Sequence, residues 1–298
     1  MNDIHQSIGV GALALLLVAG AFGGGVYAAL RLDPQALSAA AYDAGSPTPA
    51  VALDPSALQA RAAVLYDLQG GRVLYQKNAN EQLPLASLTK LMAAQTVLSV
   101  KEPATPVLIT QADVRTEGNS GMRAGETMTL GDLITLALVA SSNDAIMAAA
   151  GSLGGDPIAK MNATARGLGL TKTVFYNPTG LDVNTNQAGA YGSAYDVARL
   201  AALFYADHPD FFELTTLPDV QVDGGNKEID LVSTTVPLRS IPGFVAAKTG
   251  YTDLAGGNVV AVFDLEPGRT VVAAVLGSTH KGRFDDMKML IEAARNSL

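Results

Sequence analysis

The chain has 298 residues, enough for one large domain or two moderate ones with a sizeable core. Its net charge of −8 and the lack of a Lys/Arg cluster argue against nucleic acid as a partner. The absence of cysteine excludes disulfides, thiol catalysis and Cys-ligated zinc. The three histidines are scattered and no His-Glu-x-x-His motif occurs. We therefore expect no metal site and no other cofactor.

An uncharged, apolar run covers residues 8–30. A helix of that length reaches about 34 Å, enough to cross the core of a bilayer. We expect a signal anchor that holds the chain on the membrane; the alternative is a signal peptide cleaved after Val26-Tyr27-Ala28. No Lys or Arg precedes the run and Arg31 follows it, so the positive-inside rule gives no support for an outward-facing C-terminal part. Residues 31–58, rich in Pro, Ala, Ser and Gly, are expected to be a linker.

After the linker, strand patterns occur at both ends of the chain and helical patterns in the middle. Residues 62–67 and 72–76 predict a β-hairpin, and a helix follows Ser87 directly. From Ala104 to about Asp223 the pattern is mostly helical, with runs at 130–140, 144–153, 156–168 and 195–205 and a turn-rich loop at 175–192. Three strands (244–249, 257–264 and 269–277) and a helix (283–296) close the chain.

This order predicts an α/β (α+β) fold in which one antiparallel sheet is built from both ends of the domain and flanked by helices. We expect this domain to span residues 59–298. Its sheet subdomain would cover about 59–100 and 225–298, and a helical insert would cover about 101–224.

The segment Ser87-Leu-Thr-Lys90 pairs a hydroxyl with an amine on one helix face, because positions i and i+3 are neighbours. A serine is a poor nucleophile until a base takes its proton, and an amine of lowered pKa can be that base. The helix start also favours a developing oxyanion. By itself the motif is weak: about half a match is expected by chance, and a second one, Ser278–Lys281, does occur. The alternative is an N-cap serine with a solvated lysine.

Two further motifs strengthen the catalytic interpretation. Ser141-Ser142-Asn143 interrupts two helical runs, where a simple helix–helix turn is the alternative. Lys248-Thr249-Gly250 ends a predicted strand, where a surface lysine before a turn is the alternative. Ser-x-x-Lys, Ser-x-Asn and Lys-Thr-Gly in this order are the motif set of the penicillin-recognising serine enzymes.

The chain resembles the low-molecular-mass D-alanyl-D-alanine carboxypeptidases, a penicillin-binding serine peptidase family, over roughly residues 59–298. Beyond the three motifs, the similar segments are residues 61–100, 120–130, 177–181 and 248–252. The resemblance implies a β-lactamase/transpeptidase-like fold with the active site between the sheet and the helical insert. It also implies removal of the terminal D-alanine from peptidoglycan stem peptides that end in D-Ala-D-Ala, inhibition by β-lactam antibiotics, and an extracytoplasmic location.

The resemblance and the residue chemistry assign the same roles. Ser87 attacks the carbonyl carbon, Lys90 takes the Ser87 proton, and Ser141 relays a proton to the departing D-alanine. The residues expected to bind substrate are Asn143, Lys248, Thr249 and Gly250. The oxyanion is expected between the backbone N–H groups of Ser87 and Tyr251. Ser278–Lys281 fits no such plan and is expected at the surface.

Three segments depart from the family pattern. Ser142 stands where Gly is usual, Ser233-Thr-Thr235 replaces the usual polar residues before the Lys-Thr-Gly strand, and Val245-Ala-Ala247 stands where Val-Asp-Gly is common. These departures concern contacts with the substrate rather than the core chemistry.

The sequence argues against three other functions and leaves a fourth open. A β-lactamase needs a deacylating Glu, with an Asn four residues later, on a loop before the Lys-Thr-Gly motif. The only glutamates between Asn143 and Lys248 are Glu213 and Glu228, and they are followed at that spacing by Leu217 and Val232. A Ser-His-Asp esterase would need a Gly-x-Ser-x-Gly motif, which the chain lacks. The intact motifs argue against a non-catalytic wall-binding module. An endopeptidase that cuts D-alanyl cross-links with the same residues stays open as the nearest alternative.

Overall fold

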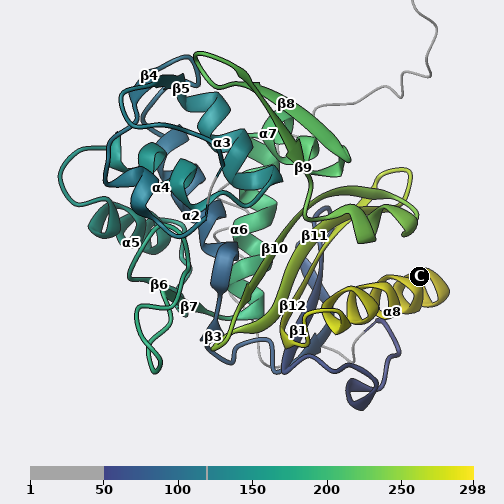
Figure 1. Cartoon of the computed structure of the whole chain (residues 1–298). Helices are drawn as coiled ribbons and strands as arrows, with labels where there is room; N and C mark the ends of the chain where they lie inside the picture. Colours follow the sequence, from purple (N-terminus) through teal and green to yellow (C-terminus); the bar gives the residue numbers. More distant parts are fainter. Residues whose placement is uncertain (1–49, 119) are drawn as a thin grey trace, which may run out of the picture. The chain divides into compact units, whose positions relative to one another are not determined.

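The computed structural model describes residues 50–118 and 120–298 (Figure 1). The predicted membrane segment, residues 8–30, and most of the predicted linker lie outside this part of the chain. Among the described residues, no helix has both the length and the apolar character needed to span a membrane.

The centre of the domain is a five-stranded antiparallel sheet in the order β10-β11-β12-β1-β2. Its strands are β1 (Ala62–Asp67), β2 (Arg72–Lys77), β10 (Phe244–Thr252), β11 (Gly256–Glu266) and β12 (Arg269–Ser278). In the pairing of β1 with β12, Ala63 lies opposite Val275 and Tyr66 opposite Val272. The sequence prediction of one sheet made from the two ends of the domain is therefore confirmed.

Both faces of this sheet are buried, which explains why β1 carries no exposed residue. Successive side chains of a strand point to opposite faces. Val64 and Tyr66 belong to the core shared with the helical part, whereas Ala63 and Leu65 belong to the core beneath α8 (Gly282–Ser297). Figure 1 shows α8 against one face of the sheet and α6 (Ala194–Asp207) behind the other.

The helical part contains α2 to α7 and the short strands that join them. The helices other than α6 are α2 (Thr89–Leu98), α3 (Leu130–Val139), α4 (Asn143–Gly151), α5 (Pro157–Gly167) and α7 (Pro209–Glu213). The short strands are β3 (Leu83–Pro84), β4 (Pro106–Leu108), β5 (Thr127–Thr129), β6 (Val174–Phe175) and β7 (Ala190–Gly192). The 3-10 turns are η1 (Pro55–Ala57), η2 (Ala86–Leu88), η3 (Asp113–Arg115), η4 (Leu214–Thr216) and η5 (Val236–Ser240). The helical runs predicted from the sequence are confirmed to within two residues at either end, because side-chain caps set most of the starts.

One element of the middle region differs from the prediction. The end of the stretch expected to be mostly helical, together with the residues after it, forms a hairpin of β8 (Asp219–Asp223) and β9 (Glu228–Val232). Val222 lies opposite Ile229, and both side chains are buried while their sequence neighbours are exposed. This alternation of apolar and polar residues around Gly224 and Gly225 is the period-2 pattern of a half-buried strand.

The end of the predicted linker is packed on the sheet domain. Val51 and Leu58 are buried in the core beneath α8, and the Val51 amide donates to the Leu74 carbonyl at 3.1 Å. The domain limits named above stay a prediction.

The second Ser-x-x-Lys match is structural, and the expectation that all of it lies at the surface is wrong for Ser278. The Ser278 side chain is buried and its hydroxyl donates to the Asp286 carboxylate at 2.6 Å. The same carboxylate accepts from the backbone N–H groups of Gln59 at 2.8 Å and Ala60 at 2.9 Å. Asp286 therefore ties the start of the sheet domain to its last helix.

We expect Asp286→Ala to lower the free energy of unfolding by about 3 kcal/mol, because it leaves two buried donors and one part-buried donor without an acceptor. Asp285→Ala is the matched control: Asp285 is the exposed neighbour in the same helical turn, and its loss should cost under about 1 kcal/mol. Urea unfolding at neutral pH measures both. Equal losses in the two variants would contradict the role of Asp286.

Candidate active site

The proposed nucleophile lies in a strained turn at the edge of the helical part. Ser87 sits in η2 immediately before α2, and its predecessor Ala86 has φ +49°, a left-handed conformation that non-glycine residues rarely adopt. The Thr89 hydroxyl holds this turn by donating to the Ala86 carbonyl at 2.7 Å. Such strain persists only where the surrounding structure enforces it, and it concentrates at functional sites.

The amine of Lys90 lies beside the Ser87 hydroxyl, as the spacing predicts. Its Nζ donates to Ser87 Oγ at 2.8 Å, to Asn143 Oδ1 at 2.6 Å and to the Thr179 carbonyl at 3.0 Å. The side chain is fully buried. Burial first, and then the positive charge of Lys248, hold the pKa of Lys90 well below its ordinary 10.5, while the charge of Asp144 opposes them.

The second and third motifs meet in the same way. Ser141 occupies the break between α3 and α4 with φ +61°, and Lys248 on β10 donates from Nζ to Ser141 Oγ at 2.8 Å. Lys248 is fully buried, and its Nζ also donates to the Thr249 carbonyl at 3.1 Å. Burial, followed by the charge of Arg283, lowers the pKa of Lys248 to about 7.

Gly250 is where β10 comes closest to η2. A Cβ on Gly250 would lie 3.0 Å from the backbone nitrogen of Ser87 and 3.0 Å from the Leu85 carbonyl oxygen. The sequence analysis names Gly250 among the residues expected to bind substrate. The contacts show that its missing side chain also admits the backbone of η2.

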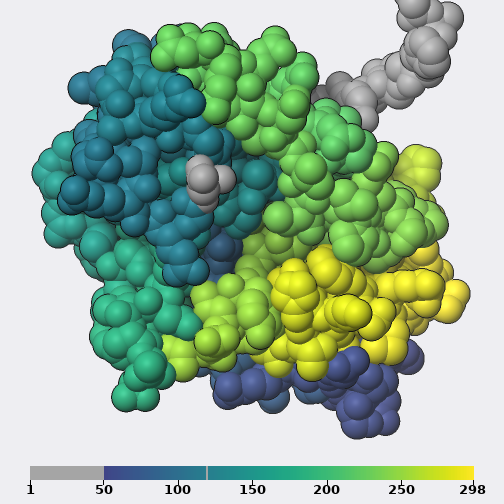
Figure 2. Space-filling model, in the orientation of Figure 1, coloured from purple at the N-terminus to yellow at the C-terminus, as the bar shows by residue number. Residues whose placement is uncertain are grey.

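The remaining predicted residues follow Lys248 along β10. Thr249 Oγ1 donates to Thr234 Oγ1 at 2.8 Å, which places Thr234 at the site. The Tyr251 side chain is half-exposed and contacts the His280 ring edge-on, with 4.9 Å between the ring centroids. Figure 2 shows the surface hollowed between the helical part and the sheet, where these segments meet.

Family comparison agrees with this geometry. Residues 49–280 match the Peptidase_S11 family, described as D-alanyl-D-alanine carboxypeptidase. The chain belongs to this family. A D-alanyl-D-alanine carboxypeptidase of Bacillus subtilis is 34% identical over 250 residues, which is 79% of this chain and 62% of that protein. A D-alanyl-D-alanine endopeptidase of Pseudomonas aeruginosa is 31% identical over 74% of this chain and 72% of its own.

Solved structures of the carboxypeptidase family and of penicillin-binding proteins share the fold. The D-alanyl-D-alanine carboxypeptidase of Mycobacterium tuberculosis superposes with a TM-score of 0.73 at 30% identity, covering 84% of this chain and 94% of that one. Penicillin-binding protein D2 of Listeria monocytogenes, in its ampicillin-bound form, gives a TM-score of 0.67 at 31% identity over 79% and 97% of the two chains. The predicted fold class and family are thus confirmed.

Sequence reasoning missed the carbonyl of Thr179, which supports the candidate site. It belongs to the turn Asn177-Pro-Thr-Gly-Leu181, which the sequence identified only as a loop and a similar segment. Asn177 holds this turn: its Oδ1 accepts from the Gly180 amide at 2.7 Å, and its Nδ2 donates to the Leu181 carbonyl at 2.9 Å. The turn thereby presents the Thr179 carbonyl to Lys90.

Arg283 was also missed, because it lies far along the chain at the start of the closing helix. Its side chain is buried, and Nη1 donates to the Gly250 carbonyl at 2.7 Å. Burial lowers the pKa of Arg283, and the same arginine lowers the pKa of Lys248. No local pattern in the sequence marks this residue.

The Ser142 departure has a physical explanation. Ser142 is the N-cap of α4: its Oγ accepts from the Ala145 amide at 3.0 Å and donates to the Asp144 carboxylate. A serine at this position adds a side-chain hydrogen bond to the helix start that glycine could not provide.

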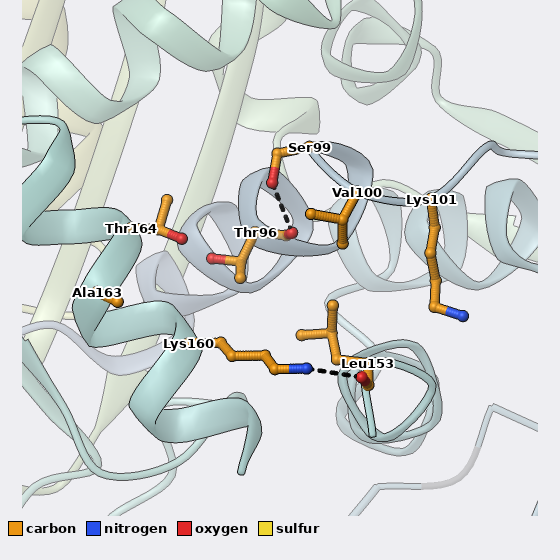
Figure 3. A pocket seen from close by; sticks show the side chains of 8 residues that line it. All are labelled: Thr96, Ser99, Val100, Lys101, Leu153, Lys160, Ala163 and Thr164. Carbon is orange, nitrogen blue, oxygen red and sulfur yellow. Dashed lines mark hydrogen bonds between the residues drawn. The ribbon is translucent and has the colours of Figure 1, made fainter. Parts of the chain in front are cut away.

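A hollow of about 590 Å³ lies elsewhere, at the opposite end of α2 from Lys90 (Figure 3). Its lining residues are Thr96, Ser99, Val100, Lys101, Leu153, Lys160, Ala163 and Thr164. Lys160 bonds to the carbonyls of Leu153 at 2.7 Å and Gly154 at 3.0 Å, at the end of α4. None of the motif residues lines this hollow, so we place the chemistry at the junction of η2, α4 and β10.

We expect Gly180→Ala to cost at least about 2 kcal/mol more than Gly154→Ala, because an added Cβ would lie 1.8 Å from the Ala86 carbonyl oxygen. The control also has a positive φ, +65° against +80°, but its Cβ would meet nothing within 4 Å. It therefore carries only the backbone cost of about 1 to 2 kcal/mol. Denaturant unfolding measures the difference, and equal values would show that the Thr179 turn does not pack on η2.

Proposed function

We propose that this chain is a serine-type D-Ala-D-Ala carboxypeptidase that trims peptidoglycan stem peptides through an acyl-enzyme on Ser87. The observation that carries the proposal is the buried amine of Lys90, with its lowered pKa, 2.8 Å from Ser87 Oγ. When neutral, this amine keeps two N–H donors for Asn143 and the Thr179 carbonyl, and its lone pair can accept the proton of the Ser87 hydroxyl.

The proposed reaction has two steps. Ser87 Oγ attacks the carbonyl carbon between the two terminal D-alanines while Lys90 accepts the hydroxyl proton. The C–N bond then breaks, and the proton held by Lys90 passes through Ser141, which is bonded to Lys248, to the departing amine. Lys90, neutral again, takes a proton from the water that attacks the ester carbonyl and returns it to Ser87 Oγ as the shortened peptide leaves. The backbone N–H groups of Ser87 and Tyr251 would hold the oxyanion, a placement supported by the approach of β10 to Ser87 at Gly250.

Two buried cations support an anionic substrate end. Lys248 and Arg283 form no ion pair with any described residue, and Arg283 Nε has no hydrogen-bond partner there. An unpaired buried charge is costly unless a ligand neutralises it. We assign binding of the substrate carboxylate to Lys248, Thr249 and Arg283. The Asn143 amide would bind the peptide group of the substrate, and Gly250 would let the substrate chain approach β10 closely.

We further propose that β-lactam antibiotics acylate Ser87, in line with the ampicillin-bound form of the Listeria protein. The domain of residues 59–298 would work outside the cytoplasm, held at the membrane by residues 8–30. The motifs also suit an endopeptidase that cuts D-alanyl cross-links, and the Pseudomonas relative favours this as the second candidate.

A fluorescent penicillin should label the purified protein covalently, and Ser87→Ala should abolish the label because the attacking oxygen is gone. Ser278→Ala, in the second Ser-x-x-Lys match, is the control and should keep it. Gel fluorescence after denaturation measures both. A label that persists in Ser87→Ala would move the nucleophile elsewhere.

Two substrates distinguish the two peptidase activities. With a pentapeptide ending in D-Ala-D-Ala we expect release of D-alanine, and with a cross-linked dimer we expect at least tenfold slower cleavage. Mass spectrometry of the products measures both rates. Faster cleavage of the dimer would identify an endopeptidase, and no product from either would favour a wall-binding module.

A further inference from the structure

Asp144 is a buried carboxylate to which the proposed chemistry assigns no task. The side chain is 2% exposed. Its Oδ2 accepts from the Ser120 amide at 3.1 Å and the Ser120 hydroxyl at 2.7 Å. Its Oδ1 accepts from the Ala145 amide at 3.0 Å and from the Ser142 hydroxyl. Both oxygens of this carboxylate therefore accept hydrogen bonds, from four donors in all.

These bonds lie directly beside Asn143, the last residue of the second motif. Asn143 lies directly before Asp144, and its amide spans two elements: Nδ2 donates to the Glu117 carbonyl at 2.8 Å and Oδ1 accepts from Lys90 at 2.6 Å. Ser120 and Glu117 belong to the same segment between η3 and β5. The Asp144 carboxylate therefore holds Ser120 at the start of α4, close to where the Nδ2 end of the Asn143 amide bonds to the same segment.

We propose that Asp144 is a positioning residue for the reaction: it locks Asn143 against Lys90 and supplies the negative charge that balances the buried amines. This inference rests on the proposed function. The residue touches neither the substrate nor the reacting atoms in this scheme; it acts through Asn143 and Lys90.

The charges around Lys90 predict the direction in which its pKa should change when Asp144 is replaced. The positive charge of Lys248 on β10 acts on Lys90, and that of Arg283 on α8 acts on Lys248. Asp144 on α4 supplies the opposing negative charge. Burial and Lys248 lower the pKa of Lys90, and Asp144 raises it. Removing the negative charge must therefore lower that pKa further, so that the neutral amine persists to lower pH.

The test compares Asp144→Asn with the wild-type protein in two ways. The pKa of Lys90, followed by NMR of ¹³C-labelled lysine side chains, should fall by about half a unit or more. The acid limb of the penicillin-acylation rate should move to lower pH by the same amount, with a plateau at least about fivefold lower because Asn143 is less firmly held. An unchanged pKa together with an unchanged plateau would overturn the proposal.

Three variants separate charge from position. Asp156→Asn, at the exposed N-cap of α5, is the matched control and should leave the pKa and the acylation rate unchanged. Asp144→Glu keeps the charge and should restore the acid limb to its wild-type pH. Ser120→Ala removes one hydrogen bond and keeps the charge, so the plateau should fall severalfold while the acid limb stays in place.

The readouts also distinguish this inference from the proposed function. The NMR titration needs no turnover, so a wild-type protein that takes no penicillin label would refute the peptidase while the coupling of Asp144 to Lys90 is still measured. If Asp144→Asn does not fold, Ser120→Ala and Ser142→Ala decide the matter. Wild-type acylation rates in both would overturn the positioning role.

Discussion

The structure depends on keeping the amine of Lys90 buried next to a hydroxyl. Taking an amine out of water is costly, so each of its hydrogen-bonding positions must find a partner. Three separate pieces of chain supply them: Ser87 from η2, Asn143 from α4 and Thr179 from the turn before β7. Because those pieces are distant in sequence, only a folded insert beside the sheet can bring them together. The burial that stabilises this arrangement also lowers the pKa of Lys90 and makes the amine a base.

Backbone strain is concentrated in the same region. Of the three described non-glycine residues with positive φ, Ala86 and Ser141 flank the site, directly before or within a motif. A tertiary contact holds each of the two residues: Gly180 packs on the Ala86 carbonyl, and Lys248 bonds to Ser141. The conformations that aim these hydroxyls are thus enforced by tertiary contacts, and local propensity alone would not select them.

The sequence predicts those features of the fold and the site that have a local sequence signal, and it does not predict those that depend on tertiary contacts. The strands of the central sheet are β-branched runs between Gly and Pro, and capping residues mark most helix starts, so both were predictable. The β8–β9 hairpin was obscured by the helical segments before it, although its alternation is visible once strands are considered. Arg283 and Thr179 carry no local signal, because each acts through a tertiary contact to β10 or α2. Ser142 was identified only as a departure from the usual Gly, and the geometry of the α4 start shows what its hydroxyl caps.

The two lysines are chemically alike, and their surroundings give them different tasks. Lys248 bonds to a hydroxyl and a carbonyl and has Arg283 near it, so an arriving carboxylate finds two cations that no described acidic side chain pairs. Such a ligand would raise the pKa of Lys248 from about 7 and hold that amine in its charged form. A charged Lys248 in turn favours the neutral form of Lys90, since two like charges so close in a buried site oppose each other. On the proposed function, the charge state of Lys248 therefore links the site assigned to the substrate carboxylate with the base Lys90.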